Sequence, residues 1–196
     1  MDINRHIRRK FRVKGVENLP FTGWLDSNRG HLAELFCELG YKVGAEIGVQ
    51  RGINAEVLLQ KNPGLKLFCI DPWAPFGRTS QQRQDRNFRH TQGRLAAYDV
   101  QYVRKTSVDA LADIPDNSLD FVYIDGLHDF DNVMMDLIGW NKKVKSGGIV
   151  SGHDYINWPE CGIIPAVNAF VQGHTILQWF LTRDYNPAPS FFWVKG

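Results

Sequence analysis

Acidic residues and histidines lie within or directly after several apolar runs of this 196-residue sequence. Glu46 lies inside one run, and Asp71 ends the next. Asp125 ends a later run, and His153 and Asp154 follow the run after that. If these runs are neighbouring strands, their side chains converge in one cleft, where carboxylates and imidazole bind a divalent metal or act as general acid and base. The shared position of these residues therefore predicts a chemical site.

The segment from Gly44 to Gly52 has the pattern of a buried strand that ends in a glycine turn and opens a helix. Gly48 and Gly52 let the backbone approach a ligand where a Cβ would clash. Asp71 has the place of an acid that holds a ribose in nucleotide-binding sheets. The glycines do not spell the Gly-x-Gly-x-x-Gly fingerprint of dinucleotide sites. With Glu46 two positions before the first turn glycine, the pattern predicts the cofactor half of such a sheet.

Each of these residues also has an ordinary structural explanation. Glu46 could pair with an arginine or cap a helix, although an acid inside an apolar strand needs partners. Asp71 precedes a proline and could be a turn residue. His128 could start the next helix, and His153 could be a core histidine. Because all of them fall near strand ends, we favour the chemical interpretation, with Asp125 and His128 as acid–base candidates.

Apolar runs alternate with helical spacings along the chain and predict the elements that position these residues. Strands are expected near residues 43–48, 65–71, 100–104, 119–124 and 149–151. Helices are expected near residues 28–39, 53–60, 108–112, 129–142 and 165–172, with an exposed one within 74–98. Runs 175–181 and 190–194 are expected to form an antiparallel pair. The prediction is an α/β fold: a single doubly wound, mostly parallel, seven-stranded Rossmann-like sheet, with ligands outside the carboxyl ends of its strands.

Composition indicates one globular domain with few special features. Hydrophobic residues make up 43% of the chain, and the formal net charge of +2 gives no reason to expect nucleic acid or a membrane as partner. Three widely spaced cysteines favour reduced thiols over a disulfide framework or a zinc site. With no apolar leader and no run that could span a bilayer, we expect a cytoplasmic protein.

The chain is expected to divide at about residue 27. Residues 1–27 form a basic N-terminal arm, and its interpretation stays open between a solvated arm and a lid that contacts an acidic ligand. Residues 28–196 form the domain that carries every candidate site residue. Two tryptophans near predicted site strands, Trp73 and Trp158, could stack on a ring of a ligand or could pack in the protein.

Four segments of the domain have a recognisable order and spacing. They are Glu46-x-Gly48, Cys69-Ile70-Asp71-Pro72-Trp73, the run from Asp120 to His128 that contains Ile124-Asp125-Gly126-x-His128, and Gly147-Gly148 to Tyr155. Together they resemble class I S-adenosylmethionine-dependent methyltransferases, in particular the metal-dependent, small-molecule branch with the macrocin and sugar O-methyltransferases. The similarity extends from about residue 42 to residue 172.

This resemblance implies S-adenosylmethionine as the cofactor. Glu46, Gly48 and Gly52 match the turn under its methionine part. Asp71 matches the acid that holds the ribose hydroxyls, and the neighbourhood of Ser107 matches the rim beside the adenine.

The resemblance also implies roles at the other end of the site. Asp125 matches the first metal-binding acid of metal-dependent relatives, and His128 matches a histidine proposed as general base in some of them. His153 and Asp154 match a further pair of metal ligands. In many relatives both members of that pair are oxygen ligands, so His153 leaves a requirement for a divalent cation, magnesium or manganese, open.

These residues lead to the hypothesis of methyl transfer from S-adenosylmethionine to a small-molecule acceptor, at a hydroxyl of a sugar or polyketide-like compound by resemblance. A nicotinamide-dependent oxidoreductase and a non-catalytic cofactor-binding module are the alternatives. No nucleic acid or membrane partner is expected, and self-association stays open.

Overall fold

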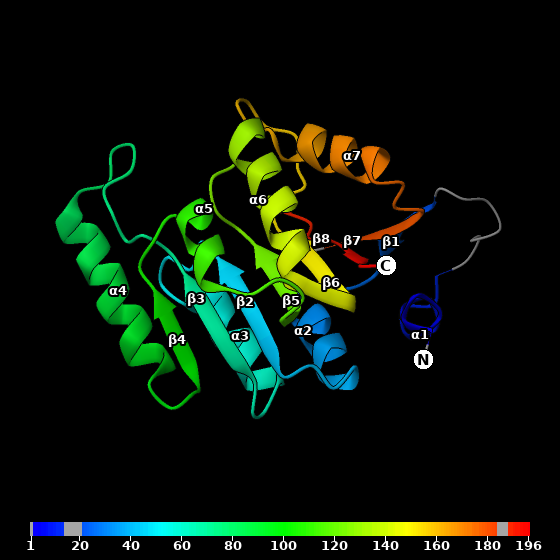
Figure 1. Cartoon of the computed structure of the whole chain (residues 1–196), viewed down its shortest axis with the longest axis horizontal. Coiled ribbons are helices and arrows are strands. Elements are labelled where there is room, and N and C mark those ends of the chain that lie inside the picture. The colour runs from blue at the N-terminus through cyan, green and yellow to red at the C-terminus, as the bar shows by residue number, and fades with distance from the viewer. Residues whose placement is uncertain (1, 14–20, 184–187) are drawn as a thin grey trace.

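Residues 2–13, 21–183 and 188–196 are described by a computed structural model of the chain, shown in Figure 1. Its strands are β1 (Phe21–Leu25), β2 (Val43–Ile47), β3 (Lys66–Ile70), β4 (Val100–Val103), β5 (Leu119–Ile124), β6 (Val144–Gly152), β7 (Gln178–Thr182) and β8 (Phe191–Val194). Its helices are α1 (Ile3–Lys10), α2 (Arg29–Glu38), α3 (Ile53–Lys61), α4 (Gln81–Leu95), α5 (Ser107–Ala110), α6 (Phe130–Lys143) and α7 (Ile163–Gly173), with a 3-10 turn η1 (Leu111–Asp113) after α5.

One sheet of eight strands has the order β1-β7-β8-β6-β5-β2-β3-β4. Neighbouring strands pair in parallel, except that β8 is antiparallel to both β6 and β7. The α/β fold, the mostly parallel sheet and the antiparallel pair near the C-terminus are thus confirmed. The strand order reverses between β5 and β2, and this reversal is the place where such sheets bind ligands.

The predicted count of seven strands is one too low, because β1 lies in the segment that was expected to be an N-terminal arm. It pairs with β7 at the edge of the sheet, with Leu25 opposite Thr182. In this short strand a threonine and a glycine break the apolar alternation, so its sequence signal is weak. Helix α1 also packs on the domain through Ile7, which is fully buried. Residues 14–20, also part of the expected arm, lie outside the described residues.

Alternate residues of the central strands enter two cores, one on each face of the sheet. Val122 and Ile124 of β5 pack in the core that contains residues of α6 and α7. Phe121 and Tyr123 pack in the core that contains residues of α2 and α3. In Figure 1 these two pairs of helices lie on opposite sides of the sheet. Side chains alternate between the two faces of a strand. This alternation therefore also determines which pair of helices each side chain packs against.

Helix α2 lies close to the centre of the sheet because Gly44 carries no side chain. A Cβ at Gly44 would lie 2.2 Å from the ring of Phe121. That ring stacks on Phe36 of α2, with 4.2 Å between the centroids. The contact holds β2, β5 and α2 together just below the strand ends that carry the candidate site. No helix in the described parts of the chain is long and apolar enough to cross a membrane.

Candidate active site

Backbone hydrogen bonds extend the parallel ladder one residue past four strands and fix the first residue of each site loop. They run from the backbone N–H of Gly48 to the carbonyl of Ile70 (2.9 Å), of Asp71 to Val103 (3.2 Å), of Asp125 to Ile47 (2.7 Å), and of His153 to Ile124 (3.0 Å). Because the strands are parallel, these loops emerge at one edge of the sheet. The structure thereby brings His153, Asp125, Gly48 and Asp71 into a row that follows the strand order β6-β5-β2-β3.

The turn after β2 requires glycine at two positions. Gly48 has a φ of +85°, and a Cβ there would lie 2.0 Å from the carbonyl oxygen of Asp125. Gly52 has a φ of +72° and precedes α3, and its Cβ would lie 3.0 Å from Thr91 of α4. The turn can therefore lie close to both the β5 loop and α4 only because these residues lack side chains.

Asp71 holds two segments in place, the glycine turn after β2 and the segment that directly follows Asp71. One carboxylate oxygen accepts the backbone N–H of Gln50 at 2.8 Å, and the other accepts that of Trp73 at 2.7 Å. Burial raises the pKa of Asp71, while these backbone donors act in the opposite direction. A carboxylate offers about four acceptor positions, so acceptor capacity remains for a ligand.

Glu46 is buried behind the glycine turn. Its Oε1 accepts a hydrogen bond from the Asn54 side chain at 3.1 Å, and its buried Oε2 has no hydrogen-bond partner among the described residues. Burial raises the pKa of Glu46 to about 8, and repulsion by Asp125 and Asp71 adds to the shift. Glu46 is thus a neutral acid at neutral pH, which makes its burial in an apolar strand tolerable.

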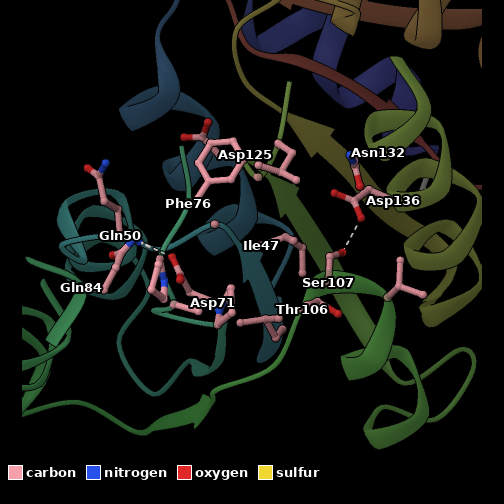
Figure 2. Close-up of a pocket in the computed structure, with 18 residues that line it drawn as sticks. Ile47, Gln50, Asp71, Phe76, Gln84, Thr106, Ser107, Asp125, Asn132 and Asp136 are labelled. Carbon is pink, nitrogen blue, oxygen red and sulfur yellow. Dashed lines mark hydrogen bonds between the residues drawn. The ribbon is translucent and has the colours of Figure 1, made fainter. Parts of the chain in front are cut away.

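A cavity of about 640 Å³ opens at the carboxyl ends of the strands, within the size range of small-molecule sites. Among the predicted residues, Gly48, Asp71, Ser107 and Asp125 line it. Figure 2 shows Asp71 on one side of the cavity, Ser107 on the other and Ile47 between them. Glu46 and Gly52 are not among the lining residues, so their predicted cofactor role would be to shape the turn.

Asp125, His128 and Asp154 form a second group beside this cavity. Each offers one ligand atom, and the three atoms lie within 4.8 Å of one another. Nε2 of His128 lies 3.3 Å from Asp154 Oδ2 and 3.7 Å from Asp125 Oδ1. Asp154 has a φ of +57°, a left-handed conformation uncommon outside glycine, and such conformations cluster at functional sites. We refer to these three residues as the acidic cluster.

The acidic cluster shifts the titration of its own members. The Asp125 carboxylate, and after it the charge of Asp154, raise the pKa of His128 above its ordinary value. Burial acts to raise the pKa of Asp154, but the hydrogen bond from His153 and the charges of both histidines outweigh it and lower the pKa. The cluster therefore favours a negative Asp154 next to an imidazole that holds its proton more firmly than usual.

His153 lies behind the acidic cluster. Its Nδ1 is 3.0 Å from Asp154 Oδ1 and 4.0 Å from Asp125 Oδ1, and only 6% of the residue is exposed. Its buried Nε2 has no hydrogen-bond partner among the described residues. The geometry gives His153 a clear role in orienting Asp154, and its predicted role as a metal ligand stays a prediction.

The two tryptophans have different surroundings. Trp73 is fully buried and packs against Phe88 of α4, with 4.7 Å between the ring centroids, so it belongs to the core. Trp158 is 39% exposed, and its ring centroid lies 5.9 Å from that of His128. Only Trp158 is therefore placed to meet a ligand beside the acidic cluster.

The structure also places in the cavity wall a carboxyl group that the sequence interpretation missed. Asp136 of α6 lines the cavity, is 4% exposed and accepts a hydrogen bond from the Ser107 hydroxyl. The signal was present, since Asp136 lies three residues after Val133 and four before Trp140, on the apolar side of the helix. A carboxylate on the buried stripe of an amphipathic helix needs a partner or a ligand.

Comparison with known sequences agrees with this geometry. The family described as "Methyltransferase domain" matches residues 45–155, which is more than half of the chain and contains all the predicted site residues. The chain belongs to this methyltransferase family. The match confirms the resemblance to S-adenosylmethionine-dependent methyltransferases, while the metal-dependent, small-molecule branch stays a prediction.

The chain is also similar to an uncharacterized protein of Acanthamoeba polyphaga mimivirus, with 27% identity over 133 residues that cover 64% of this chain and 58% of the relative. It spans only 7% of a second curated relative, an uncharacterized protein of Sinorhizobium fredii.

Solved structures share the fold at low sequence identity. The O-methyltransferase TomG of Streptomyces achromogenes, in complex with S-adenosylmethionine, matches with a TM-score of 0.62 and 16% identity over 100% of this chain and 91% of TomG. An rRNA methylase of Streptococcus thermophilus matches with a TM-score of 0.62 and 12% identity over 86% of this chain and 97% of that protein. One of these proteins is named as an O-methyltransferase and the other as an rRNA methylase. The shared fold therefore does not determine the acceptor.

The raised pKa of Glu46 predicts a pH-dependent stability. Folded and unfolded chains both hold the Glu46 proton below about pH 4.5, but up to about pH 8 only the folded chain keeps it. Stability from the neutral acid is therefore lost as the pH rises through this window, by up to about 1.4 kcal/mol per pH unit. We expect urea unfolding at pH 5 to 8 to show this decline in the wild type and a weaker decline in Glu46→Gln.

Glu34→Gln serves as the matched control. Glu34 is paired with Lys61, and its hydrogen bond to that lysine lowers its pKa, so its contribution changes only at acidic pH. Parallel stability profiles of wild type and Glu46→Gln would show that Glu46 is ionised in the folded protein.

Proposed function

We propose that this protein transfers the methyl group of S-adenosylmethionine to a hydroxyl of a small molecule. The observation that carries the proposal is the position of Asp125, which lines the cavity and also belongs to the acidic cluster. A cofactor in the cavity would thus lie directly beside groups that can activate a hydroxyl. Methyl transfer is an in-line displacement, so holding nucleophile, methyl and sulfur in one line supplies much of the rate.

The lining of the cavity suits the ribose and the flat ring of the cofactor. Asp71 has acceptor capacity left beyond its backbone donors, which suits a ribose hydroxyl. Farther along, Ile47, Val108 and Leu127 give the wall an apolar surface that suits a flat ring. Gly48 lets the turn approach the rest of the cofactor closely.

His128 is the proposed general base. Its Nε2 lies between the carboxylates of Asp125 and Asp154, and its ring is next to the exposed Trp158. The neighbouring carboxylates stabilise the imidazolium that forms when His128 takes the proton of the acceptor hydroxyl. Trp158 offers a flat apolar surface on which the acceptor can rest.

The acidic cluster also fits a divalent cation. Two carboxylates and one imidazole with ligand atoms within 4.8 Å suit magnesium or manganese, and the imidazole moves the preference toward manganese, iron or zinc. Asp125 and Asp154 would hold the ion, which would lower the pKa of a hydroxyl bound to it, and an unligated His128 would keep the role of general base. His153 supports this arrangement by holding Asp154 from behind.

Asp71→Ala is expected to weaken cofactor binding. Each hydrogen bond from a ribose hydroxyl to the carboxylate contributes about 1.5–3 kcal/mol, so the affinity for S-adenosylhomocysteine should fall at least about tenfold in calorimetry. Asp99→Ala is the control and should bind normally, because Asp99 is exposed and precedes β4, at the amino ends of the strands and away from the cavity. An unchanged affinity in Asp71→Ala would reject the cofactor assignment.

His128→Gln is expected to reduce turnover by about 10²–10⁴-fold, the range of general-base catalysis, with little change in affinity for S-adenosylhomocysteine. The assay is release of S-adenosylhomocysteine with a panel of hydroxylated small molecules. Because the base must be neutral and its pKa is raised, wild-type turnover should increase with pH through a value above 6.5. His90→Gln, an exposed histidine of α4, is the control. Equal losses of turnover and cofactor affinity would instead give His128 a structural role.

A divalent cation is expected to stabilise the wild type but not Asp154→Asn. Manganese added to chelator-treated protein should raise the unfolding temperature, because an ion that binds only the folded state stabilises it. Activity should fall in chelator and return with the metal. Asp113→Asn, an exposed carboxylate paired with Lys105, should respond as the wild type does. Full activity of a metal-free preparation in chelator would leave the cluster to proton transfer alone.

A further inference from the structure

Positive charge is concentrated in one part of the chain. Residues 78–105 contain seven arginines and lysines and two aspartates, whereas the whole chain has a net charge of only +2. The remaining residues therefore carry a net negative charge. The sum of the charges gives no reason to expect an anionic partner, but their uneven distribution does, because a partner responds to the local field at the surface it meets.

Most of this charge lies on helix α4, at one end of the molecule. In Figure 1 the helix lies beside β4, which is the edge strand of the sheet. Thr91 and Leu95 form its buried side. Arg83, Arg86 and Arg89 are exposed and follow one another at intervals of three residues, so their side chains are neighbours on the helix surface.

Arg104, directly after β4, extends this charge beside the helix. Its guanidinium group lies over the ring of Phe88 of α4, 4.7 Å from the ring centroid, and the residue is exposed. A cation in this position is attracted to the ring, so Arg104 is held against the helix. We refer to Arg83, Arg86, Arg89 and Arg104 as the basic face.

The arginines of the basic face have no carboxylate within ion-pair distance among the described residues. Arg94, in the last turn of the same helix, does form such a pair, with Glu56 of α3. Asp85 is the single acid of α4, and it accepts a hydrogen bond from the Gln81 side chain at 2.8 Å. The charge of the basic face is therefore available to a ligand.

This arrangement reduces the stability of the helix. Like charges three or four residues apart repel one another on a helix surface, and a positive charge in the first turn opposes the helix dipole. Arg83 lies in that first turn, which contains no acid. Acids placed among these arginines would stabilise the helix, so a ligand that supplies the anions explains the unbalanced charge better than solubility does.

The composition of the exposed surface of α4 favours one class of anionic ligand. The exposed residues of the helix are glutamines, arginines, His90 and Gly93, with no large apolar residue. A protein interface has an apolar core, and a helix at a membrane surface inserts apolar side chains. A nucleic acid requires neither, because its phosphates bind basic side chains by charge and release counterions. Arginine, which occupies all four positions, also matches phosphate oxygens with two parallel hydrogen bonds.

We propose that the basic face binds the phosphate backbone of a nucleic acid strand. The helix rises about 9 Å from Arg83 to Arg89, a length over which one strand presents about three phosphates at a spacing of about 3.4 Å. None of the four arginines is among the residues that line the cavity, so this surface is distinct from the proposed active site. The inference does not rest on the proposed function.

The test measures the binding of short fluorescein-labelled single strands, one of RNA and one of DNA with the same sequence, to the full-length protein by fluorescence anisotropy. The triple variant Arg83→Gln, Arg86→Gln, Arg89→Gln should bind at least about tenfold more weakly than the wild type at low salt. Its slope of log K against log salt should be less steep by about 2, the contribution of three phosphates of a single strand. Glutamine is a good helix former, so the unfolding temperature should not fall.

The triple variant Arg5→Gln, Arg9→Gln, Arg12→Gln is the matched control. It removes the same charge from three exposed arginines in and directly after α1. Its affinity for the strands should stay within about threefold of the wild type, with an unchanged salt slope. Equal losses in the two triple variants would show that only the total charge matters and would overturn the inference.

Other ligands separate the nucleic acid from other anions. Polyglutamate that binds as tightly as the strands would show a general attraction to anions. Vesicles rich in phosphatidylglycerol that bind through the same arginines, while the strands do not bind, would assign the face to a membrane. Either result, or a wild type that binds neither strand at low salt, would overturn the inference. A preference for RNA or for DNA that the basic-face variant loses would support it and identify the strand.

A single substitution keeps the inference testable if the basic-face triple variant does not fold. Arg104→Gln leaves the sequence of α4 unchanged. It should make the salt slope less steep by about 0.7, the contribution of one phosphate, and weaken binding of the strands at low salt by about threefold. An unchanged slope and affinity in Arg104→Gln would then overturn the inference.

Discussion

The site depends on the parallel backbone ladder, which continues one residue beyond the strands. The N–H groups of Gly48, Asp71, Asp125 and His153 each bond to the last carbonyl of a neighbouring strand. Each candidate residue thus begins its loop at a position set by the sheet and not by the loop itself. A ligand held by these residues gains from a geometry that exists before it binds, which lowers the entropic cost of ordering the site.

Gathering so many acids at one edge has an electrostatic cost, and the structure meets it differently at each position. Asp71 is surrounded by backbone N–H donors, and Asp154 lies against two histidines. Glu46 accepts a hydrogen bond from the Asn54 amide and is neutral at neutral pH. Asp136 accepts a hydrogen bond from the Ser107 hydroxyl. The acids therefore differ in how much interaction with a ligand they can still accept.

The sheet and most of the site could be predicted because their signals are local. Apolar runs that end in Asp71, Asp125 and His153 specify both the strands and the edge at which they meet. Strand β1 was missed because an edge strand is defined by its pairing with β7, which is distant in sequence. Asp136 was missed because its role depends on Ser107 across the cavity. The sequence shows its place on the buried stripe of α6, but not what it meets there.

The two ends of the site differ in what holds them, and this bears on which part sets the acceptor. The residues that the sheet ladder positions, Gly48, Asp71, Asp125 and His153, all lie inside the family match at residues 45–155. Beyond the acidic cluster, Trp158 comes from the loop after β6 and lies past the end of that match. Loops are held less rigidly than strands and tolerate change more readily. The loop that carries Trp158 can therefore change while the sheet ladder that positions Asp71 and Asp125 is kept, so one fold can carry sites that differ beyond the acidic cluster.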